Sequence, residues 1–325
     1  MTFSIAPSSA TSQNASAQDA YGISVENISV TYSNARLALY NASCYIQPGT
    51  ITGLVGPNGG GKSTLFKSIM GFLSPSQGRV HIDNLSIDQA QKRQLIAYVP
   101  QADEVDWNFP ISVYDVVMMG RYGHMNIFRV PSRKDRRVVM ESLARVGMSA
   151  FKDRQIGELS GGQKKRAFLA RAIAQEGKVI LLDEPFTGVD VKTEKSIINL
   201  LLQLREEGHT VLVSTHDLAS ISTFCDRVIL LNQTILAAGT TAETFTEDNL
   251  VMTFGGLPLS SLPSHQGASS QPQIVKPQIV NQPGHTQPTK MPIVNAESRM
   301  NAESGMNAES RVSEQKNASS QRTDR

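Results

Sequence analysis

Nearly continuous apolar runs of strand length recur along the middle of the chain, separated by stretches with helical spacing. The clearest runs cover residues 51–55, 179–182, 210–214 and 228–231. Runs that are apolar throughout, rather than at every second position, are typical of strands buried on both faces of a parallel sheet. We therefore expect an α/β fold with a mostly parallel sheet, in which ligands bind at the carboxyl ends of the strands.

Composition divides the chain into three parts. Residues 1–20 are small and polar, residues 21–256 carry the strand and helix patterns, and residues 257–325 are rich in Ser, Gln, Pro and Asn. The last part repeats the short sequences Pro-Gln-Ile-Val and Asn-Ala-Glu-Ser and lacks the apolar content to bury a core. We predict a disordered N-terminal segment and a disordered low-complexity tail on either side of one folded domain.

Charge and cysteine content exclude several classes of protein. The formal net charge of +2 is too close to neutral to favour a nucleic acid or an anionic membrane surface, and the basic run 133–137 is expected to be a solvated helix start. Two isolated cysteines, Cys44 and Cys225, cannot form a zinc site and fit a reducing compartment. No apolar run approaches the roughly 20 residues of a membrane span, and residues 1–20 do not resemble a secretory signal. We expect a cytoplasmic protein that reaches a membrane only through a partner.

A glycine-rich segment follows the first apolar run and fits the pattern G-x-x-x-x-G-K-[ST]. Glycines let the backbone curl so that its N–H groups point at phosphate oxygens, and the helix that follows presents its positive dipole end to the same anion. Lys62 is expected to reach the β- and γ-phosphates of ATP, and the Ser63 hydroxyl to ligate Mg²⁺. The predicted nucleotide-binding residues of this loop are Gly56, Pro57, Asn58, Gly59, Gly60, Gly61, Lys62, Ser63 and Thr64.

Two adjacent acids, Asp183 and Glu184, follow the apolar run 179–182 and precede Pro185. Asp183 is expected to help hold Mg²⁺ through its hydration shell. Glu184, whose side chain is directed differently, is expected to polarise the attacking water as a general base. A solvated strand end is the ordinary alternative, but two acids directly after four aliphatic residues make it weaker.

A second glycine-containing element, Leu-Ser-Gly-Gly-Gln at residues 159–163, precedes a helix that we expect over residues 164–174, with Ser160 as its cap. A glycine-softened helix N-terminus is another anion site, and one ATP does not need two such sites from one chain. Alone, this pentapeptide could be a helix cap and nothing more. Together with the two motifs above it predicts further nucleotide contacts from Ser160, Gly161, Gly162 and Gln163.

The order and spacing of these three motifs resemble the ABC ATPase family over about residues 22–256. The resemblance implies a P-loop NTPase core with a mostly parallel sheet, an antiparallel β subdomain and an inserted helical subdomain at about residues 105–165. It also implies ATP hydrolysis by a homodimer, in which each ATP lies between the glycine loop of one chain and the Leu-Ser-Gly-Gly-Gln signature of the other. Single residues match the family as well. Tyr32 would stack on adenine, Gln101 would sense Mg²⁺ and link to the transport channel, residues 187–190 would cross to the partner chain, and His216 would contact the γ-phosphate and orient Glu184.

Each of these single residues also has an ordinary interpretation, as a strand aromatic, a loop residue or a structural histidine. Their positions relative to the three motifs favour function. The resemblance thus implies Glu184 and His216 as catalytic residues and Ser63, Gln101 and Asp183 as the residues around the Mg²⁺ of Mg-ATP.

Two segments of the inserted region are similar to the ATPases of manganese, zinc and iron importers, which work with an extracytoplasmic metal-binding receptor. They read Val-Asp-Trp-Asn-Phe-Pro at 105–110 and Met-Gly-Arg-Tyr-Gly at 119–123. The resemblance implies integral membrane permease subunits as partners and a peripheral location on the cytoplasmic face of the inner membrane. Trp107, Phe109 and Tyr122 would shape a groove for a permease helix, although packing within the helical subdomain explains each of them equally well. Among the metals the resemblance favours manganese over zinc or iron.

Other classes of ATPase remain as alternatives. Siderophore, haem and cobalamin importer ATPases share the glycine-arginine step of the segment 119–123. A soluble DNA-repair ATPase inserts a long coiled coil between the two motifs, whereas only about a hundred residues without sustained heptads intervene here. Translation ATPases carry two cassettes in one chain, and a regulator without turnover would need neither Glu184 nor His216. No nucleic acid partner is expected.

Overall fold

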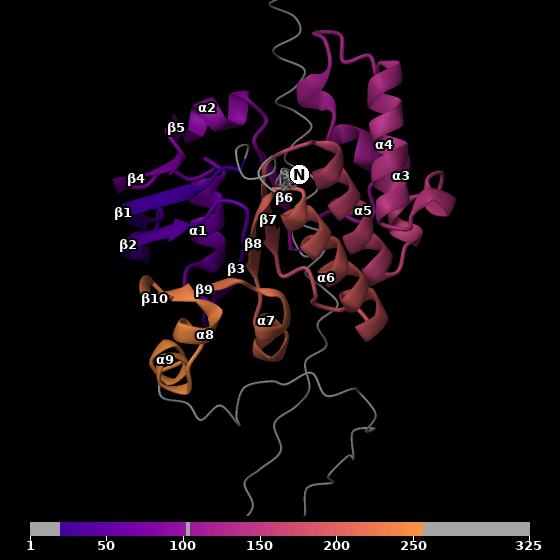
Figure 1. Cartoon of the computed structure of the whole chain (residues 1–325). Helices are drawn as coiled ribbons and strands as arrows, with labels where there is room; N and C mark the ends of the chain where they lie inside the picture. Colours follow the sequence, from indigo (N-terminus) through magenta and orange to yellow (C-terminus); the bar gives the residue numbers. More distant parts are fainter. Residues whose placement is uncertain (1–19, 102–104, 256–325) are drawn as a thin grey trace, which may run out of the picture. The chain divides into compact units, whose positions relative to one another are not determined.

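Two β-sheets with helices around them make up residues 20–101 and 105–255, the part of the chain that the computed structural model describes (Figure 1). These residues belong to one unit, and a second unit, Ser269–Arg325, lies outside the described residues. The two segments predicted to be disordered also fall almost wholly outside them. The helices and helical turns are α1 (Lys62–Ile69), α2 (Ile87–Lys92), α3 (Val113–Met119), η2 (Tyr122–His124), α4 (Arg133–Arg145), η3 (Ser149–Phe151), η4 (Ile156–Glu158), α5 (Gly161–Ala174), α6 (Val191–Glu206), α7 (Leu218–Phe224), α8 (Thr241–Thr244) and α9 (Glu247–Thr253).

The larger sheet contains all four runs that the sequence predicts as strands. Its strands, in order across the sheet, are β10 (Thr234–Thr240), β9 (Arg227–Asn232), β3 (Ile51–Val55), β8 (Thr210–Ser214), β7 (Val179–Asp183) and β6 (Ile96–Val99). β9, β3, β8, β7 and β6 run parallel, and β10 pairs antiparallel with β9 at one edge. The predicted mostly parallel sheet is confirmed.

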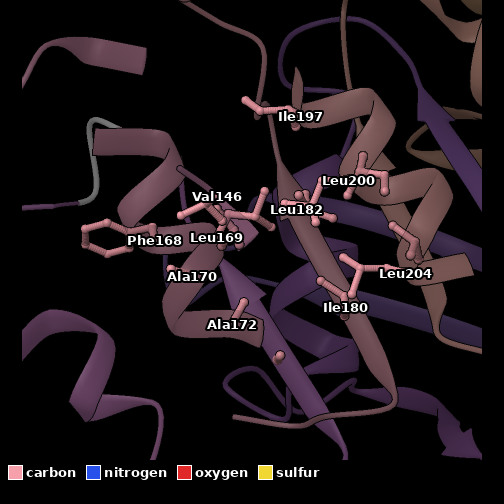
Figure 2. Packing of buried hydrophobic residues seen from close by; sticks show 14 of the residues in the cluster. Val146, Phe168, Leu169, Ala170, Ala172, Ile180, Leu182, Ile197, Leu200 and Leu204 are labelled. Carbon is pink, nitrogen blue, oxygen red and sulfur yellow. The ribbon is translucent and has the colours of Figure 1, made fainter. Parts of the chain in front are cut away.

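Side chains that alternate between two cores explain why these strands are apolar throughout. In β7, Val179 and Leu181 belong to the core shared with α1 and the smaller sheet. Ile180 and Leu182 belong to the core shared with α5 and α6. Figure 2 shows Leu182 between Leu169 of α5 and Leu200 of α6. Since neither face meets water, neither set of alternate positions needs to be polar.

The smaller sheet is antiparallel and lies on the α1 side of the larger one, to its left in Figure 1. Its strands, in order, are β2 (Leu37–Ile46), β1 (Ile23–Thr31), β4 (Gln77–Ile82) and β5 (Leu85–Ser86). Leu65, Phe66 and Ile69 of α1 are fully buried in the core that joins the two sheets. The antiparallel β subdomain implied by the resemblance is therefore confirmed.

The helical part of the chain is joined to the larger sheet through α5. α3, α4 and α5 pack against one another, and α5 and α6 lie to the right of the larger sheet in Figure 1. The Arg171 guanidinium donates to the Tyr98 carbonyl at 3.1 Å, and the Gln175 amide donates to the Ile96 carbonyl at 2.6 Å. These bonds satisfy carbonyls on the outer edge of β6, which would otherwise be an open strand edge.

The predicted start of the helix after the signature is wrong by three residues. α5 begins at Gly161 rather than at residue 164, so the two glycines form its first turn. Ser160 caps the helix as predicted, and the Gln163 side chain returns to the Ser160 backbone to complete a capping box. This reciprocal cap stabilises a helical first turn in spite of the low helix propensity of glycine.

A buried ionic network joins α3, α4 and the residues after α5. The side chain of Arg121 is only 1% exposed, and its guanidinium bonds the Asp135 carboxylate at 3.0 Å, the Ala174 carbonyl at 2.7 Å and the Glu176 carboxylate at 2.6 Å. Burial by itself raises the pKa of Asp135. Hydrogen bonds from Ser132 and the charge of Arg121 outweigh that effect and lower the pKa to about 2. The other residues of the basic run 133–137 are exposed at the start of α4, as predicted.

Candidate active site

The glycine-rich loop links the end of β3 to the start of α1, as predicted. Gly61 caps α1 with a φ of 100°, a conformation that side chains with a Cβ rarely adopt. A Cβ at Gly56 would lie 1.9 Å from the Leu231 carbonyl oxygen of the neighbouring strand β9. The loop therefore needs glycine at both positions, and its curl presents the N-terminus of α1 to the cleft in front of it.

The ammonium of Lys62 lies inside this curl. It donates to the carbonyls of Gly56 at 2.8 Å and Pro57 at 3.1 Å. Burial lowers the pKa of Lys62, and the nearby charges of Glu184 and Asp183 only partly oppose that effect. The structure thus brings the predicted phosphate-binding lysine close to the predicted acidic pair.

A cleft of about 770 Å³ opens over the loop and collects most of the predicted site residues. Tyr32 stands at its edge, where its hydroxyl lies 3.0 Å from the Thr64 hydroxyl. Gly60 and Asp183 do not line the cleft, and neither does any residue of the signature. The lining residues are Tyr32, Arg36, Ala38, Gly56, Pro57, Asn58, Gly59, Gly61, Lys62, Ser63, Thr64, Gln101, Glu184, His216 and Phe254.

Both predicted acids are held by the neighbouring strand. β7 and β8 run parallel in register, so that Asp183 is the partner of Ser214 at the carboxyl edge of the sheet. Asp183 is 2% exposed, and the Ser214 hydroxyl donates to its carboxylate. The N–H of Glu184 donates to the Ser214 carbonyl at 3.2 Å and to the Ser214 hydroxyl oxygen at 3.0 Å.

The Glu184 carboxylate points toward the cleft and meets two further side chains there. The Thr187 hydroxyl donates to its Oε2 at 3.1 Å, and the Nδ1 atom of His216 lies 3.5 Å from the same oxygen. Glu184 and His216 are thus brought together, at the ends of adjacent strands. A carboxylate fixed in this way can accept a proton from a water bound above it.

The residues predicted around Mg²⁺ supply a hydroxyl, an amide and a carboxylate. Ser63 and Gln101 line the cleft, and Asp183 lies buried at the end of β7 beneath it. Oxygen donors of this kind suit Mg²⁺, which proteins commonly share with the phosphates of a substrate. Within residues 20–101 and 105–255, no cluster of three or more His, Cys, Asp or Glu side chains is placed to hold a metal ion by itself.

The signature lies outside the cleft that contains its own chain's glycine loop. Ser160 and Gly161 are exposed, and a Cβ at Gly161 would lie 3.1 Å from the Gly188 carbonyl oxygen. Gly162 lies against the Thr193 side chain, with 3.0 Å between that side chain and a Cβ built at Gly162. The signature therefore borders residues 187–190, and the structure does not bring it together with Lys62.

Several cleft residues were not predicted from the sequence. Arg36 follows Tyr32 closely in the turn between β1 and β2, and a basic residue there was an available signal for a phosphate-binding surface. Phe254, just after α9, carries no such signal, and neither does Ser214, which lies buried at the end of β8 behind the acids rather than in the cleft. Phe254 is far from the glycine loop in sequence, and a serine at a strand end is common.

Comparison with known proteins places these motifs in a family. The family profile described as ABC transporter matches residues 39–187. The manganese transport system ATP-binding protein MntA of Synechocystis sp. is 78% identical over 240 residues, which are 74% of this chain and 92% of that protein. The chelated iron transport system membrane protein YfeB of Yersinia pestis is 62% identical, over 72% of this chain and 79% of that protein. The zinc transport system ATP-binding protein TroB of Treponema pallidum is 42% identical, over 75% and 90%.

Solved structures of ATP-binding cassettes share the fold. The ADP conformation of MJ1267, a cassette of an ABC transporter, has a TM-score of 0.62 and 27% identity and covers 73% of this chain and 99% of that one. The dimeric bacterial ABC transporter cassette MJ0796 has a TM-score of 0.60 and 29% identity, over 67% and 98%. The P-loop NTPase fold implied by the resemblance is confirmed. With 78% identity across 92% of one ATP-binding subunit, this chain belongs to the ABC transporter family as an ATP-binding subunit that hydrolyses ATP.

Proposed function

We propose that this chain is the motor subunit of an importer that couples ATP binding and hydrolysis to the uptake of a divalent metal ion, with manganese as the first candidate. The similarity to a manganese transport ATPase at 78% identity is the observation that carries the choice of metal. The cleft that joins the glycine loop, Glu184 and His216 supports the motor role.

In this proposal the loop N–H groups and Lys62 bind the phosphates of ATP, and Tyr32 stacks on the adenine ring. Glu184 takes a proton from the attacking water, while Thr187 and His216 keep its carboxylate oriented toward the cleft. Mg²⁺, when bound with ATP, neutralises charge on the phosphate oxygens, and Ser63, Gln101 and Asp183 are the residues that would hold it.

We assign the signature to the ATP of a second copy of this chain. Ser160, Gly161, Gly162 and Gln163 lie outside the cleft of their own chain, at an exposed helix N-terminus that suits an anion. The similarity to a dimeric cassette supports a homodimer in which each ATP is shared between two chains. ATP then favours the closed pair because it contacts both chains only in that state.

We assign the binding of the permease to an exposed apolar surface of the helical region. Ile127, Phe128 and Val130, here called the apolar tip, are 91%, 81% and 59% exposed between η2 and α4. Phe109 and Tyr122 of the same region are also exposed. By contrast, Trp107 packs edge-on against Phe168, with 5.2 Å between the two ring centroids. Packing within the helical region therefore explains Trp107 better than a contact with the permease.

Attachment through the permease makes the chain a peripheral protein of the cytoplasmic face of the inner membrane. None of the described helices is both long and apolar enough to span a bilayer. A metal-binding receptor on the opposite side is the indirect partner that a metal importer requires. The similarity to a chelated iron transport protein at 62% identity favours uptake of a metal chelate, such as a siderophore complex, as the second candidate.

Replacing the general base tests the motor role directly. Glu184→Gln is expected to lower the turnover of ATP by roughly 10²–10⁴-fold because the proton acceptor is lost. Binding of ATP is expected to persist, and size-exclusion chromatography with ATP should then trap the dimer. Undiminished hydrolysis by this variant would refute the role of Glu184.

A further inference from the structure

Glu184 adopts a backbone conformation that is unusual for its residue type. Its φ of 47° lies in the left-handed region, where a residue with a Cβ is strained. Such a conformation persists only where the surroundings hold it on more than one side. The Ser214 carbonyl and hydroxyl hold the N–H of Glu184, at 3.2 Å and 3.0 Å.

The carbonyl of Glu184 is held from the opposite direction by α5. The ammonium of Lys165 donates to it at 2.9 Å, and Lys165 is only 5% exposed. Burying an ammonium is costly unless it is hydrogen-bonded, so this contact is a specific one. Lys165 lies about one helical turn after Gly161, the first residue of α5.

α5 is therefore connected to three parts of the proposed machinery. Its first turn contains the signature glycines, Lys165 in the second turn holds Glu184, and Arg171 near its end holds the Tyr98 carbonyl of β6. β6 leads directly to Gln101. A shift of α5 would change the position of Glu184 in the same chain, because helices in packed cores move as units.

We propose that Lys165 is a positioning residue that holds Glu184 in its productive conformation and makes that conformation depend on the placement of α5. The inference rests on the proposed role of Glu184 as general base. Closure of the signature over the ATP of the partner chain would move α5, and Lys165 transmits that movement to the Glu184 of its own chain.

The test compares Lys165→Met with Lys164→Met in the full chain bound to its permease in proteoliposomes. Lys164 is the matched control, because it is the adjacent lysine of α5 and its ammonium lies over the Trp107 ring, 4.8 Å from its centroid, away from Glu184. Lys165→Met is expected to lower kcat by roughly 10- to 100-fold, because small displacements of a reacting group cost that much. The KM for ATP is expected to stay within about threefold, and Lys164→Met to keep both constants within about twofold.

Two further variants separate positioning from folding. Lys165→Gln keeps a hydrogen-bond donor and is expected to retain more kcat than Lys165→Met; it also replaces Lys165→Met if that variant does not fold. Adding Lys165→Met to Glu184→Gln is expected to lower turnover no further, because both act on the same step. The inference is overturned if folded Lys165 variants keep the parent kcat, if KM rises while kcat is unchanged, or if Lys164→Met is equally slow. Failure of the general-base role itself would appear separately, as undiminished hydrolysis by Glu184→Gln alone.

Discussion

The hydroxyl of Ser214 serves both acids of the site at once. It donates to the Asp183 carboxylate and accepts the N–H of Glu184 at 3.0 Å. Ser214 is fully buried, so water cannot replace these bonds when the hydroxyl is removed. One side chain thus fixes the orientation of two adjacent acids that we assign to different tasks.

Removing this hydroxyl should slow turnover and also lower stability, because it leaves buried partners of both acids without their hydrogen bonds. Ser214→Ala is expected to lower kcat about tenfold and to reduce the free energy of unfolding by about 1–3 kcal/mol, the usual cost of leaving a buried group unsatisfied. ATPase kinetics and urea unfolding measure the two effects. Ser142→Ala is the control, because Ser142 is a buried serine whose hydroxyl donates to the Val138 carbonyl in α4. The kcat of this variant should stay at the parent value. Equal loss of kcat in both variants would contradict the assignment.

How far the sequence predicts single residues depends on whether a motif fixes their spacing. Lys62 and Glu184 occupy the places that their motifs require, and the structure brings both to one cleft. Phe254 reaches the same cleft through the fold alone. It follows α9, which is far from the glycine loop in the sequence, and no local pattern encodes its place in the cleft.

At the scale of elements, the Arg121 network decides how the helical region is attached. Arg121 follows α3, Asp135 lies in the first turn of α4, and Glu176 follows α5, so that one guanidinium joins all three. The network is buried around Arg121, and the loss of Asp135 would leave the guanidinium with the half-exposed carboxylate of Glu176 as its acidic partner in this network.

This network gives the protein an acid-sensitive contribution to stability. The pKa of Asp135 is about 2 in the folded chain and roughly 3.9 in an unfolded one. Because the folded value is the lower one, the contribution is complete above about pH 5 and is lost as the pH falls toward 2. At neutral pH, Asp135→Asn is expected to cost roughly 2–3 kcal/mol of unfolding free energy, the amount that corresponds to this difference in pKa.

Urea unfolding of the parent and Asp135→Asn between pH 3 and pH 7 tests this expectation. The difference between the two proteins should shrink as the pH falls, since the parent then loses the charge that the variant lacks. Glu141→Gln is the control, because its pairing with Arg137 at 3.7 Å is exposed and should contribute less than about 1 kcal/mol. A difference that does not change with pH would show that Asp135 acts by packing alone.

The apolar tip makes a separate prediction for the helical region. Replacing Ile127 and Phe128 together by serine is expected to abolish co-purification with the permease, because an exposed apolar patch of this kind marks a binding surface. The ATPase activity of the isolated chain should stay within about twofold of the parent. Phe72→Ser, at another exposed aromatic residue, should leave co-purification intact. Unchanged association of the double variant would exclude the tip as the docking surface.

The sequence predicts the bounds of an element well where every residue of that element is buried. It predicts them poorly where one capping residue determines where a helix begins. β3 and β8 have the predicted bounds because both faces of these strands are buried. The sequence predicts the start of α5 too late, because Gly161 and Gly162 have a low helix propensity. The capping box formed by Ser160 makes both glycines helical. The boundaries proposed for the helical subdomain, about residues 105–165, remain a prediction; α3 and α4 fall inside them and α5 continues beyond them.

At the scale of the whole molecule, the glycine loop and the signature of one chain do not share a cleft. The sequence predicted this separation only through the family resemblance, because spacing alone does not show which chain the signature serves. Two copies are therefore needed to complete each proposed site, and the unit that does work is a dimer attached to a permease. The metal that this unit moves is outside the chain's own chemistry, so transport itself has to be measured.

Uptake of radiolabelled manganese by a strain deleted for this chain tests the account most directly. The strain is complemented either with the parent chain or with Glu184→Gln, and expression of both is matched by immunoblot. We predict that the deletion abolishes high-affinity uptake, that the parent chain restores it and that Glu184→Gln does not. Uptake that survives the deletion, or that Glu184→Gln restores as well as the parent, would contradict the assignment of this chain as the motor of a manganese importer.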